Sequence, residues 1–320
     1  MILQDIKKIA IIRRNGFGDF ICAVPLIRHI ENTYPNAKIT LFVDERNHSI
    51  VPYFFKHLEV VVIPRGNKYF SLFKTGLKYR GRKFDLVVSV KASPMKLNNL
   101  FMAILGGKHN MAIVDKGKWH SRFVDYQRNP ADYKTGHQAL NCLRIFDPDI
   151  KCIAPDLYPE IKLDNIAQQS ISLPRPYLLV SISNNRPDST ISLESLAHIA
   201  NDLYIKHDIS VLISCMENDH KQAEKLQHAL NMGSQICITP DLDSFLSLLN
   251  QADVVLVGDG GICHFAASLN KNLVALYAGT SLEKWGPLSK HTICLFDEKN
   301  VNNLPLSDVK NAVETFLTRT

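Results

Sequence analysis

The sequence of 320 residues contains no apolar run near the ~20 residues that a membrane-spanning helix needs. Its seven cysteines are scattered and form no C-x-x-C pair, which argues against a zinc site and a disulfide framework. The first apolar run, residues 9–12, ends at Arg13 and is too short for the core of a secretory signal peptide. These absences predict a cytoplasmic globular protein without a structural metal.

The balance of charge differs between the two halves of the chain. Residues 1–155 contain 25 lysines and arginines against 12 acidic residues, whereas residues 156–320 contain 12 against 19. The basic excess predicts that the first half meets an anionic partner such as a phosphorylated glycan or an acidic lipid surface. A solvated basic face without a partner remains open, and nucleic acid is disfavoured because no nucleic-acid-binding motif accompanies the charge.

Short apolar runs alternate with amphipathic stretches, which predicts parallel sheets with helices on both faces. The length suits two domains of about 150 residues each, divided within a proline-rich linker at 147–176. Residues 115–133 have little periodicity and are expected to form a loop that faces a ligand. The expected strands are 8–12, 38–43, 59–63, 84–90, 109–114, 177–183, 209–214, 235–238, 253–257 and 273–277, and the expected helices are 20–33, 48–56, 69–79, 94–105, 136–146, 192–206, 219–230, 242–251 and 262–270.

A glycine loop, Arg13-Arg14-Asn15-Gly16-Phe17-Gly18-Asp19-Phe20, follows the first expected strand. Glycines at this point allow a tight turn and leave amide groups uncovered for an anion, and Asp19 then lies on the first helical turn. On its own, this motif favours a purely structural role, in which Asp19 caps the helix and the glycines serve the turn.

A second glycine turn, Val257-Gly258-Asp259-Gly260-Gly261, leads into a helix that carries His264. Uncovered amides and the positive end of the helix dipole suit a diphosphate there, and Asp259 can accept hydrogen bonds from sugar hydroxyls. The next strand ends in Gly279-Thr280-Ser281, whose hydroxyls and amides are expected on the same side. The alternative is that Asp259 only caps the helix and His264 only packs in it.

These motifs together resemble glycosyltransferase family 9, the heptosyltransferases. The stretches V-G-D-G-G-x-x-H-x-A-A-S-L and A-L-Y-A-G-T-S-x-E-K-W-G-P are similar to the family's C-terminal signature. The opening I-I-R-R-N-G-F-G-D-F and the later H-Q-A-L-N-C-L occur in the family's order. The resemblance extends over most of the chain.

The resemblance implies a GT-B fold, with two Rossmann-like βαβ domains that face each other across a cleft. Residues 1–155 would bind the acceptor and residues 156–320 a nucleotide sugar such as ADP-heptose, with the final helix, about 307–318, packing back on the first domain. It implies an inverting reaction without a metal or another cofactor, in which Asp19 is the base. The expected donor residues are Asp259, Gly260, Gly261, His264, Glu217, Arg186, Ser183 and Thr280, and the expected acceptor residues are Arg14, Asn15, Gly18, Lys91, Trp119 and Arg122.

The expected acceptor is an anionic glycolipid of the lipopolysaccharide core or a related bacterial surface glycan, with peripheral contact at the cytoplasmic face of the inner membrane. One departure from the family concerns the donor phosphates: Ser189 stands where the family has a lysine, and Arg186 can supply that charge. Glu217 corresponds to a ribose-binding glutamate, although a solvated acid at a helix start is the alternative.

Two other functions remain open. A non-catalytic relative that binds glycan or nucleotide is suggested by Ser189 and by Gly260, which replaces the usual threonine. A dinucleotide-dependent oxidoreductase would need G-x-G-x-x-G and an acid at the end of the second strand; Asp44 lies there, but the loop has no third glycine.

Overall fold

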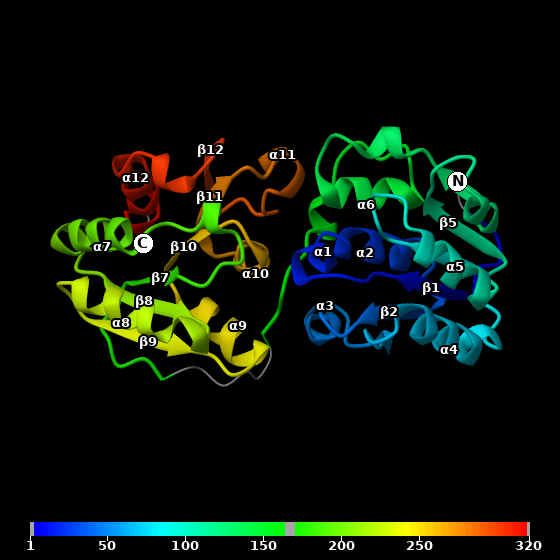
Figure 1. Ribbon diagram of the computed structural model, residues 1–320, viewed down its shortest axis with the longest axis horizontal. Coiled ribbons are helices and arrows are strands. Elements are labelled where there is room, and N and C mark those ends of the chain that lie inside the picture. Colours follow the sequence, from blue (N-terminus) through cyan, green and yellow to red (C-terminus); the bar gives the residue numbers. More distant parts are fainter. Residues whose placement is uncertain (1–2, 164–169, 319–320) are drawn as a thin grey trace. The chain divides into compact units, whose positions relative to one another are not determined.

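The computed structural model describes residues 3–163 and 170–318. Its chain divides into two compact units, Met1–Pro159 and Glu160–Thr320. Each unit is a parallel sheet of six strands covered by helices (Figure 1). Part of the predicted linker, residues 164–169, lies outside the described residues.

The sheet of the first unit has the strand order β3-β2-β1-β4-β5-β6, the doubly wound order of Rossmann folds. Continuous apolar runs form its central strands, because both faces of such a sheet are buried. The strands are β1 (Lys8–Ile12), β2 (Lys38–Asp44), β3 (Glu59–Ile63), β4 (Leu86–Ser89), β5 (His109–Ile113) and β6 (Tyr126–Arg128). The helices are α1 (Phe17–Ile21), α2 (Val24–Thr33), α3 (Val51–Phe54), α4 (Lys68–Arg80), α5 (Lys96–Leu105) and α6 (Gln138–Phe146), with short 3₁₀ turns η1 (His48–Ile50), η2 (Trp119–Phe123), η3 (Pro130–Tyr133) and η4 (Pro155–Leu157).

Helices α4 and α5 cover one face of this sheet and pack tightly on each other. Phe101 and Met102 of α5 join Phe42 and Ile12 of the strands in one buried cluster. Gly76 of α4 allows the close approach, because a Cβ there would lie 2.5 Å from a methyl group of Ile104. The pair of helices therefore forms a rigid layer whose outer side is available to solvent.

The second unit repeats the same strand order, read along its sheet as β12-β11-β10-β7-β8-β9. One buried cluster lies between the sheet and helices α7, α8 and α12, and further buried residues on α9 and α10 include Leu246, Leu249 and Phe265. The strands are β7 (Tyr177–Ser181), β8 (Ser210–Cys215), β9 (Ser234–Ile238), β10 (Val254–Gly258), β11 (Asn272–Ala278) and β12 (Thr292–Asp297). The helices are α7 (Leu193–His207), α8 (His220–Ala229), α9 (Leu242–Gln251), α10 (Gly261–Ser268), α11 (Leu282–Trp285) and α12 (Leu306–Leu317), with 3₁₀ turns η5 (Pro187–Ser189), η6 (Glu217–Asp219) and η7 (Val301–Asn303).

Two edge strands were not predicted. Strand β6 lies inside the expected loop 115–133 and pairs with β5, and β12 pairs with β11 beyond the last expected strand. Most residues of both strands are only partly buried, so they lack the continuous apolar run that identifies a central strand. Each sheet consequently has one more strand than the sequence predicts.

One helix prediction also needs correction. The expected helix 20–33 is divided into α1 and α2, because Pro25 has no amide hydrogen to donate within a continuous helix and instead occupies the first turn of α2. The final helix was expected to pack on the first domain. Val309, Val313 and Phe316 of α12 lie in the core of the second unit.

In the described part of the chain, none of the helices is both long and apolar enough to cross a membrane.

Candidate functional site

Each sheet has a switch point, where neighbouring strands lead into connections that run in opposite directions. Strands β1 and β4 form it in the first unit, and β7 and β10 form it in the second. In doubly wound sheets, ligands bind beyond the carboxyl ends of the strands at this point. The segments that follow β1 and β4 carry Asp19 and Lys91, and those that follow β7 and β10 carry Arg186 and Asp259.

Arg13, at the end of β1, connects the segments around the first switch point. Its side chain is only 1% exposed, and Nη1 donates to the carbonyl of Val90, just after β4, at 2.8 Å. Nε donates to the backbone carbonyl of Asp19 at 2.7 Å, and Nη2 donates to the Oδ1 atom of Asp19 at 2.7 Å. A buried guanidinium thereby fixes the position of the candidate base relative to both strands.

Asp19 lies in the first turn of α1, with about a third of its side chain exposed. Its Oδ1 atom is held by Arg13, whereas within residues 3–163 and 170–318 no protein group donates a hydrogen bond to Oδ2. One oxygen is therefore oriented and the other is available for a ligand. The sequence motif selected Asp19 but gave no role to Arg13.

Two further basic side chains, Lys91 and Arg14, belong to the segments that follow β4 and β1. Burial lowers the pKa of Lys91, and the negative charge of Asp19 opposes that effect. Burial also lowers the pKa of Arg14, against the attraction of Asp44, and the buried Nε and Nη1 atoms of Arg14 have no hydrogen-bond partner in the described structure. Buried donors without partners are uncommon, and they make this loop suited to an anion.

The glycines of this turn were expected to adopt the unusual backbone angles that a tight turn needs, but another residue adopts them. Gly16 has an ordinary extended backbone, with φ −75°, and Gly18 is part of α1. The positive φ, 104°, belongs to Asn15, a residue type that adopts such angles more readily than most. The Oδ1 atom of Asn15 accepts a hydrogen bond from Arg46 at 3.1 Å.

Asp44, the acid at the end of β2, is buried and engaged by protein groups. Burial would raise its pKa, but hydrogen bonds and charge from Arg46 and the amide of Asn15 outweigh burial, and its pKa is lowered. The carboxylate that a dinucleotide enzyme would use for ribose is therefore occupied by neighbouring protein groups. Asp44 serves instead to hold the loop after β1.

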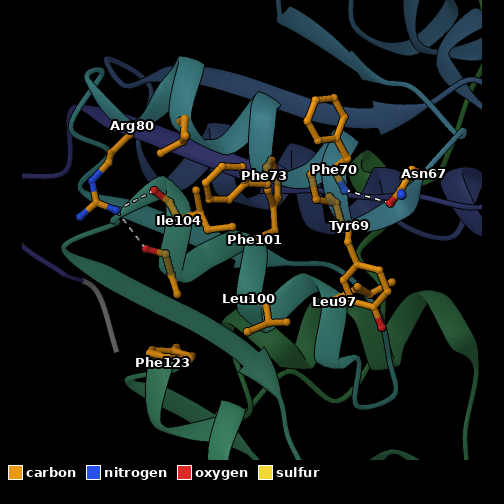
Figure 2. A pocket seen from close by; sticks show the side chains of 13 residues that line it. Asn67, Tyr69, Phe70, Phe73, Arg80, Leu97, Leu100, Phe101, Ile104 and Phe123 are labelled. Carbon is orange, nitrogen blue, oxygen red and sulfur yellow. Dashed lines mark hydrogen bonds between the residues drawn. The ribbon is translucent and has the colours of Figure 1, made fainter.

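Trp119 and Arg122, two expected acceptor residues, lie on η2. Lys96 lies over the ring of Trp119, and Arg122 lies over the ring of Phe123, at 5.5 and 5.0 Å from the ring centroids. Phe123 lines an apolar groove between α4 and α5 (Figure 2). The contacts of Trp119 and Arg122 thus associate them with this groove.

At the second switch point, an ion pair joins the loops after β7 and β10. Asp259 is 2% exposed, and its Oδ2 atom accepts a hydrogen bond from Nη1 of Arg186. The same nitrogen donates to the hydroxyl of Thr280 at 2.9 Å. Arg186 therefore contacts two other expected donor residues, Asp259 and Thr280, directly.

Ser189, which stands where the family has a lysine, is fully buried. Its hydroxyl hydrogen-bonds to the backbone of Ala278 at the end of β11. The Arg186 side chain, by contrast, is half exposed, and its Nε and Nη2 atoms donate to no protein group in the described chain. Arg186 is the residue that offers free cationic donors at this point.

Asn184 was not singled out from the sequence, yet it connects the same loops. Its Nδ2 atom donates to the carbonyl of Asp259 at 3.1 Å, and its Oδ1 atom accepts from the amide of Arg186 at 3.0 Å. An asparagine between a serine and another asparagine has no sequence feature that marks this role. Only the pairing of β7 with β10 brings its partners together.

The remaining donor residues fall into two groups. Gly260 and Gly261 form the start of α10, and His264 is buried in that helix. Ser183 accepts a hydrogen bond from the amide of Met216 and donates to Asp219, which fixes the turn η6 where the exposed Glu217 lies. Asp219 also lines a cavity of about 420 Å³ with Asn184 and Gln222.

Solved glycosyltransferases share this architecture along their whole length. A glycosyltransferase of family 9 from Veillonella parvula matches with a TM-score of 0.84 at 16% identity, covering 100% of this chain and 99% of that one. The ADP-heptose lipopolysaccharide heptosyltransferase II of E. coli matches with a TM-score of 0.81 at 18% identity, covering 98% and 99%. The fold is thus that of the GT-B glycosyltransferases, the class to which these paired Rossmann-like units correspond.

The sequence comparisons identify the family within this class. Lipooligosaccharide heptosyltransferase 2 of Haemophilus ducreyi is 24% identical over 316 residues, which cover 90% of this chain and 88% of that protein. The model of glycosyltransferase family 9 (heptosyltransferase) matches residues 106–311. The chain belongs to glycosyltransferase family 9 and is a glycosyltransferase of the heptosyltransferase type.

Proposed function

We propose that this protein transfers heptose, or a similar sugar, from an ADP-sugar to an anionic acceptor of the bacterial lipopolysaccharide core or a related surface glycan. The transfer inverts the anomeric centre and needs no metal ion or other cofactor. Asp19 acts as the general base, and the second unit binds the donor. The observation that carries the proposal is the Arg13–Asp19 contact at the first switch point, which leaves one carboxylate oxygen available.

The charges around Asp19 support an acceptor that carries carboxylate or phosphate groups. Arg14 has buried donor atoms without protein partners, and Lys91 lies close enough for its pKa to respond to Asp19. Guanidinium groups bind carboxylate and phosphate in paired geometry. An inner-core glycan with acidic groups would satisfy these donors while its hydroxyl meets Asp19.

The contacts around Arg186 support a diphosphate donor. Arg186 keeps Nε and Nη2 free of protein partners while Asp259 and Thr280 hold Nη1. The start of α10 adds amide groups and the positive end of an eight-residue helix dipole. The similar E. coli protein is an ADP-heptose lipopolysaccharide heptosyltransferase, which supports ADP-heptose as the first donor to test.

In the proposed reaction, the acceptor hydroxyl oxygen attacks the anomeric carbon, and the bond from that carbon to the diphosphate oxygen breaks. The electron pair of that bond leaves with ADP, and the hydroxyl proton passes to Oδ2 of Asp19. A sugar hydroxyl is far less acidic than a carboxylic acid, so the proton moves as the new bond forms. Arg186 and the start of α10 stabilise the departing charge, which is the larger electrostatic task.

The test is turnover of ADP-heptose on a deeply truncated lipopolysaccharide by the wild type and by Asp19→Asn. Loss of the base should lower kcat by about 10²- to 10⁴-fold. Asp149→Asn, which removes an exposed carboxylate of the same unit, is the matched control and should retain the wild-type rate. Equal rates for wild type and Asp19→Asn would refute the role of Asp19.

Four further measurements test the remaining parts. Proton NMR of the product reports whether the anomeric configuration is inverted, and activity that persists in a chelator supports independence from metal. A panel of ADP-, UDP- and GDP-sugars identifies the donor. Tight ADP binding by calorimetry, with no transfer from any donor, would favour the alternative of a non-catalytic relative.

A further inference from the structure

An apolar groove of about 700 Å³ lies on the first unit between α4, α5 and η2 (Figure 2). Aromatic and aliphatic side chains form nearly all of it, and it has no part in the reaction proposed above. Its lining includes Tyr69, Phe70, Phe73, Leu77, Leu100 and Phe123. Such a surface on a globular protein needs an explanation, since large exposed apolar patches usually mark a binding partner.

The exposed apolar residues gather on one side of α4. Tyr69, Phe70, Phe73 and Leu77 are each between 50% and 63% exposed, whereas Leu72 and Gly76 are buried. Residues 69, 73 and 77 are four positions apart and therefore share one helix face. The helix thus has an inner side that packs on α5 and an outer apolar side with no packing partner in the described structure.

The groove lies in the most basic part of the chain. Residues 64–124 contain 13 lysines and arginines and only two acidic residues, Asp85 and Asp115. Helices α4 and α5 and the turn η2 contain no acidic residue at all. On α4, Lys74 and Lys78 are exposed next to the apolar side chains.

Several cations are held beside the apolar side chains. Lys96 lies over the ring of Trp119, which is 54% exposed, and Arg122 lies over the ring of Phe123 in the groove wall. Arg80, at the other end, donates a hydrogen bond to the carbonyl of Ile104 at 3.0 Å. Aromatic rings with lysines and arginines next to them are typical of proteins at the boundary between lipid headgroups and acyl chains.

We infer that this face docks the protein on an anionic phospholipid bilayer. The exposed side chains of α4 enter the boundary between headgroups and acyl chains, and the surrounding lysines and arginines bind the lipid phosphates. Charge complementarity selects this occupant, because a second copy of the chain would place two strongly basic faces against each other. The inference concerns a surface outside the proposed active site and does not depend on the transfer reaction.

Co-sedimentation with vesicles tests the inference. Wild-type protein should bind vesicles of phosphatidylcholine mixed with phosphatidylglycerol, bind pure phosphatidylcholine far less, and dissociate as salt rises. Phe70→Gln/Phe73→Gln should lower the partition coefficient more than tenfold. Both rings are exposed to water in the free protein and would be buried only when the protein binds the membrane. Lys74→Gln/Lys78→Gln should lower it by about fivefold per charge on the anionic vesicles only.

Matched control variants lie in the second unit. Ile205→Gln removes an apolar side chain that is 84% exposed on α7, and Lys221→Gln/Lys225→Gln removes two exposed charges on α8. Both should bind vesicles like the wild type. Circular dichroism of all variants checks that each remains folded.

Three results would overturn the inference. The first is that the wild type does not bind vesicles, and the second is that Phe70→Gln/Phe73→Gln binds them as well as the wild type does. The third is that the wild type is a dimer that does not bind vesicles and this variant is a monomer, which would assign the face to self-association. Transfer to a water-soluble, deacylated acceptor separates this inference from the proposed function. Phe70→Gln/Phe73→Gln should retain transfer to this soluble acceptor. If the proposed function is wrong, the wild type will show no transfer but will still bind vesicles.

Discussion

The backbone carbonyl of Ser189 lies only 1.7 Å from the point where a Cβ atom on Gly258 would be. Strand β10 therefore ends in glycine because the loop after β7 passes directly over it. The two loops of the second switch point are in contact through main chain as well as through the Arg186–Asp259 ion pair.

We expect Gly258→Ala to destabilise the second unit by at least about 2 kcal/mol, because the new methyl group meets backbone that cannot move aside easily. Gly261→Ala is the matched control. It has no atom within 4 Å of the new methyl group and lies at the first position of α10, so it should be neutral or stabilising by up to about 1 kcal/mol. Urea unfolding measures both, and similar stability for the two variants would contradict the close approach.

Arg13→Met should destabilise the first unit by about 2 to 4 kcal/mol, because it leaves the carbonyls of Asp19 and Val90 without their buried donor. Asp19→Asn retains an acceptor for Arg13 and should cost much less stability while it removes activity. Thermal unfolding measured beside turnover separates the two effects. A stable but inactive Arg13→Met would show instead that Arg13 acts mainly on the reacting groups.

Arg186→Ala should weaken ADP binding by about 10- to 100-fold, because charged hydrogen bonds to phosphate contribute about 1.5 to 3 kcal/mol. Calorimetry with ADP and AMP tests this, since the loss should be larger for the diphosphate. Arg175→Ala, which breaks the pair with Asp253 elsewhere in the unit, is the control.

A lysine at position 189 should not compensate for the loss of Arg186. Ser189 is fully buried against Ala278, so Ser189→Lys places an unpaired charge in the interior and should destabilise the fold. If Arg186→Ala/Ser189→Lys bound ADP like the wild type, the assignment of the phosphate contact to Arg186 would be wrong.

The way in which the free energy of unfolding changes at acid pH should depend on Asp44. Its pKa is lowered in the folded protein, so its stabilising effect is present above the usual aspartate value of about 3.9 and is lost as the pH falls further. Asp44→Asn should therefore be less stable than wild type at pH 7, and the difference should shrink below about pH 4. Urea unfolding across this range, with Asp149→Asn as the control for an exposed carboxylate, gives the comparison.

The fold was predictable because the central strands are continuous apolar runs separated by amphipathic helices. The alternation of apolar runs with amphipathic stretches, as seen on either side of Ile12 and of Val257, indicates a doubly wound sheet. The edge strands β6 and β12 were missed because partly exposed strands combine polar and apolar residues without a clear period. Pro25 could have predicted the break between α1 and α2.

The sequence indicates those candidate site residues that lie in a motif, but not those whose position depends on packing. The motifs selected Asp19 and Asp259, and the departure at Ser189 directed attention to Arg186, which the structure places in contact with Asp259. Of two adjacent arginines, however, only the fold distinguishes the buried Arg13 from Arg14. Long-range pairing of strands, which a single sequence does not reveal, makes that distinction.

The hydrogen bonds of Asn184 have a thermodynamic consequence for ligand binding. Because Asn184 already connects the loop after β7 to the carbonyl of Asp259, these segments are ordered before any nucleotide arrives. A preorganised site loses little conformational entropy on association, so more of the contact energy with a diphosphate becomes affinity. Replacement of this one amide would leave the proposed phosphate contacts, Arg186 and the start of α10, in place and still raise the entropic cost of binding.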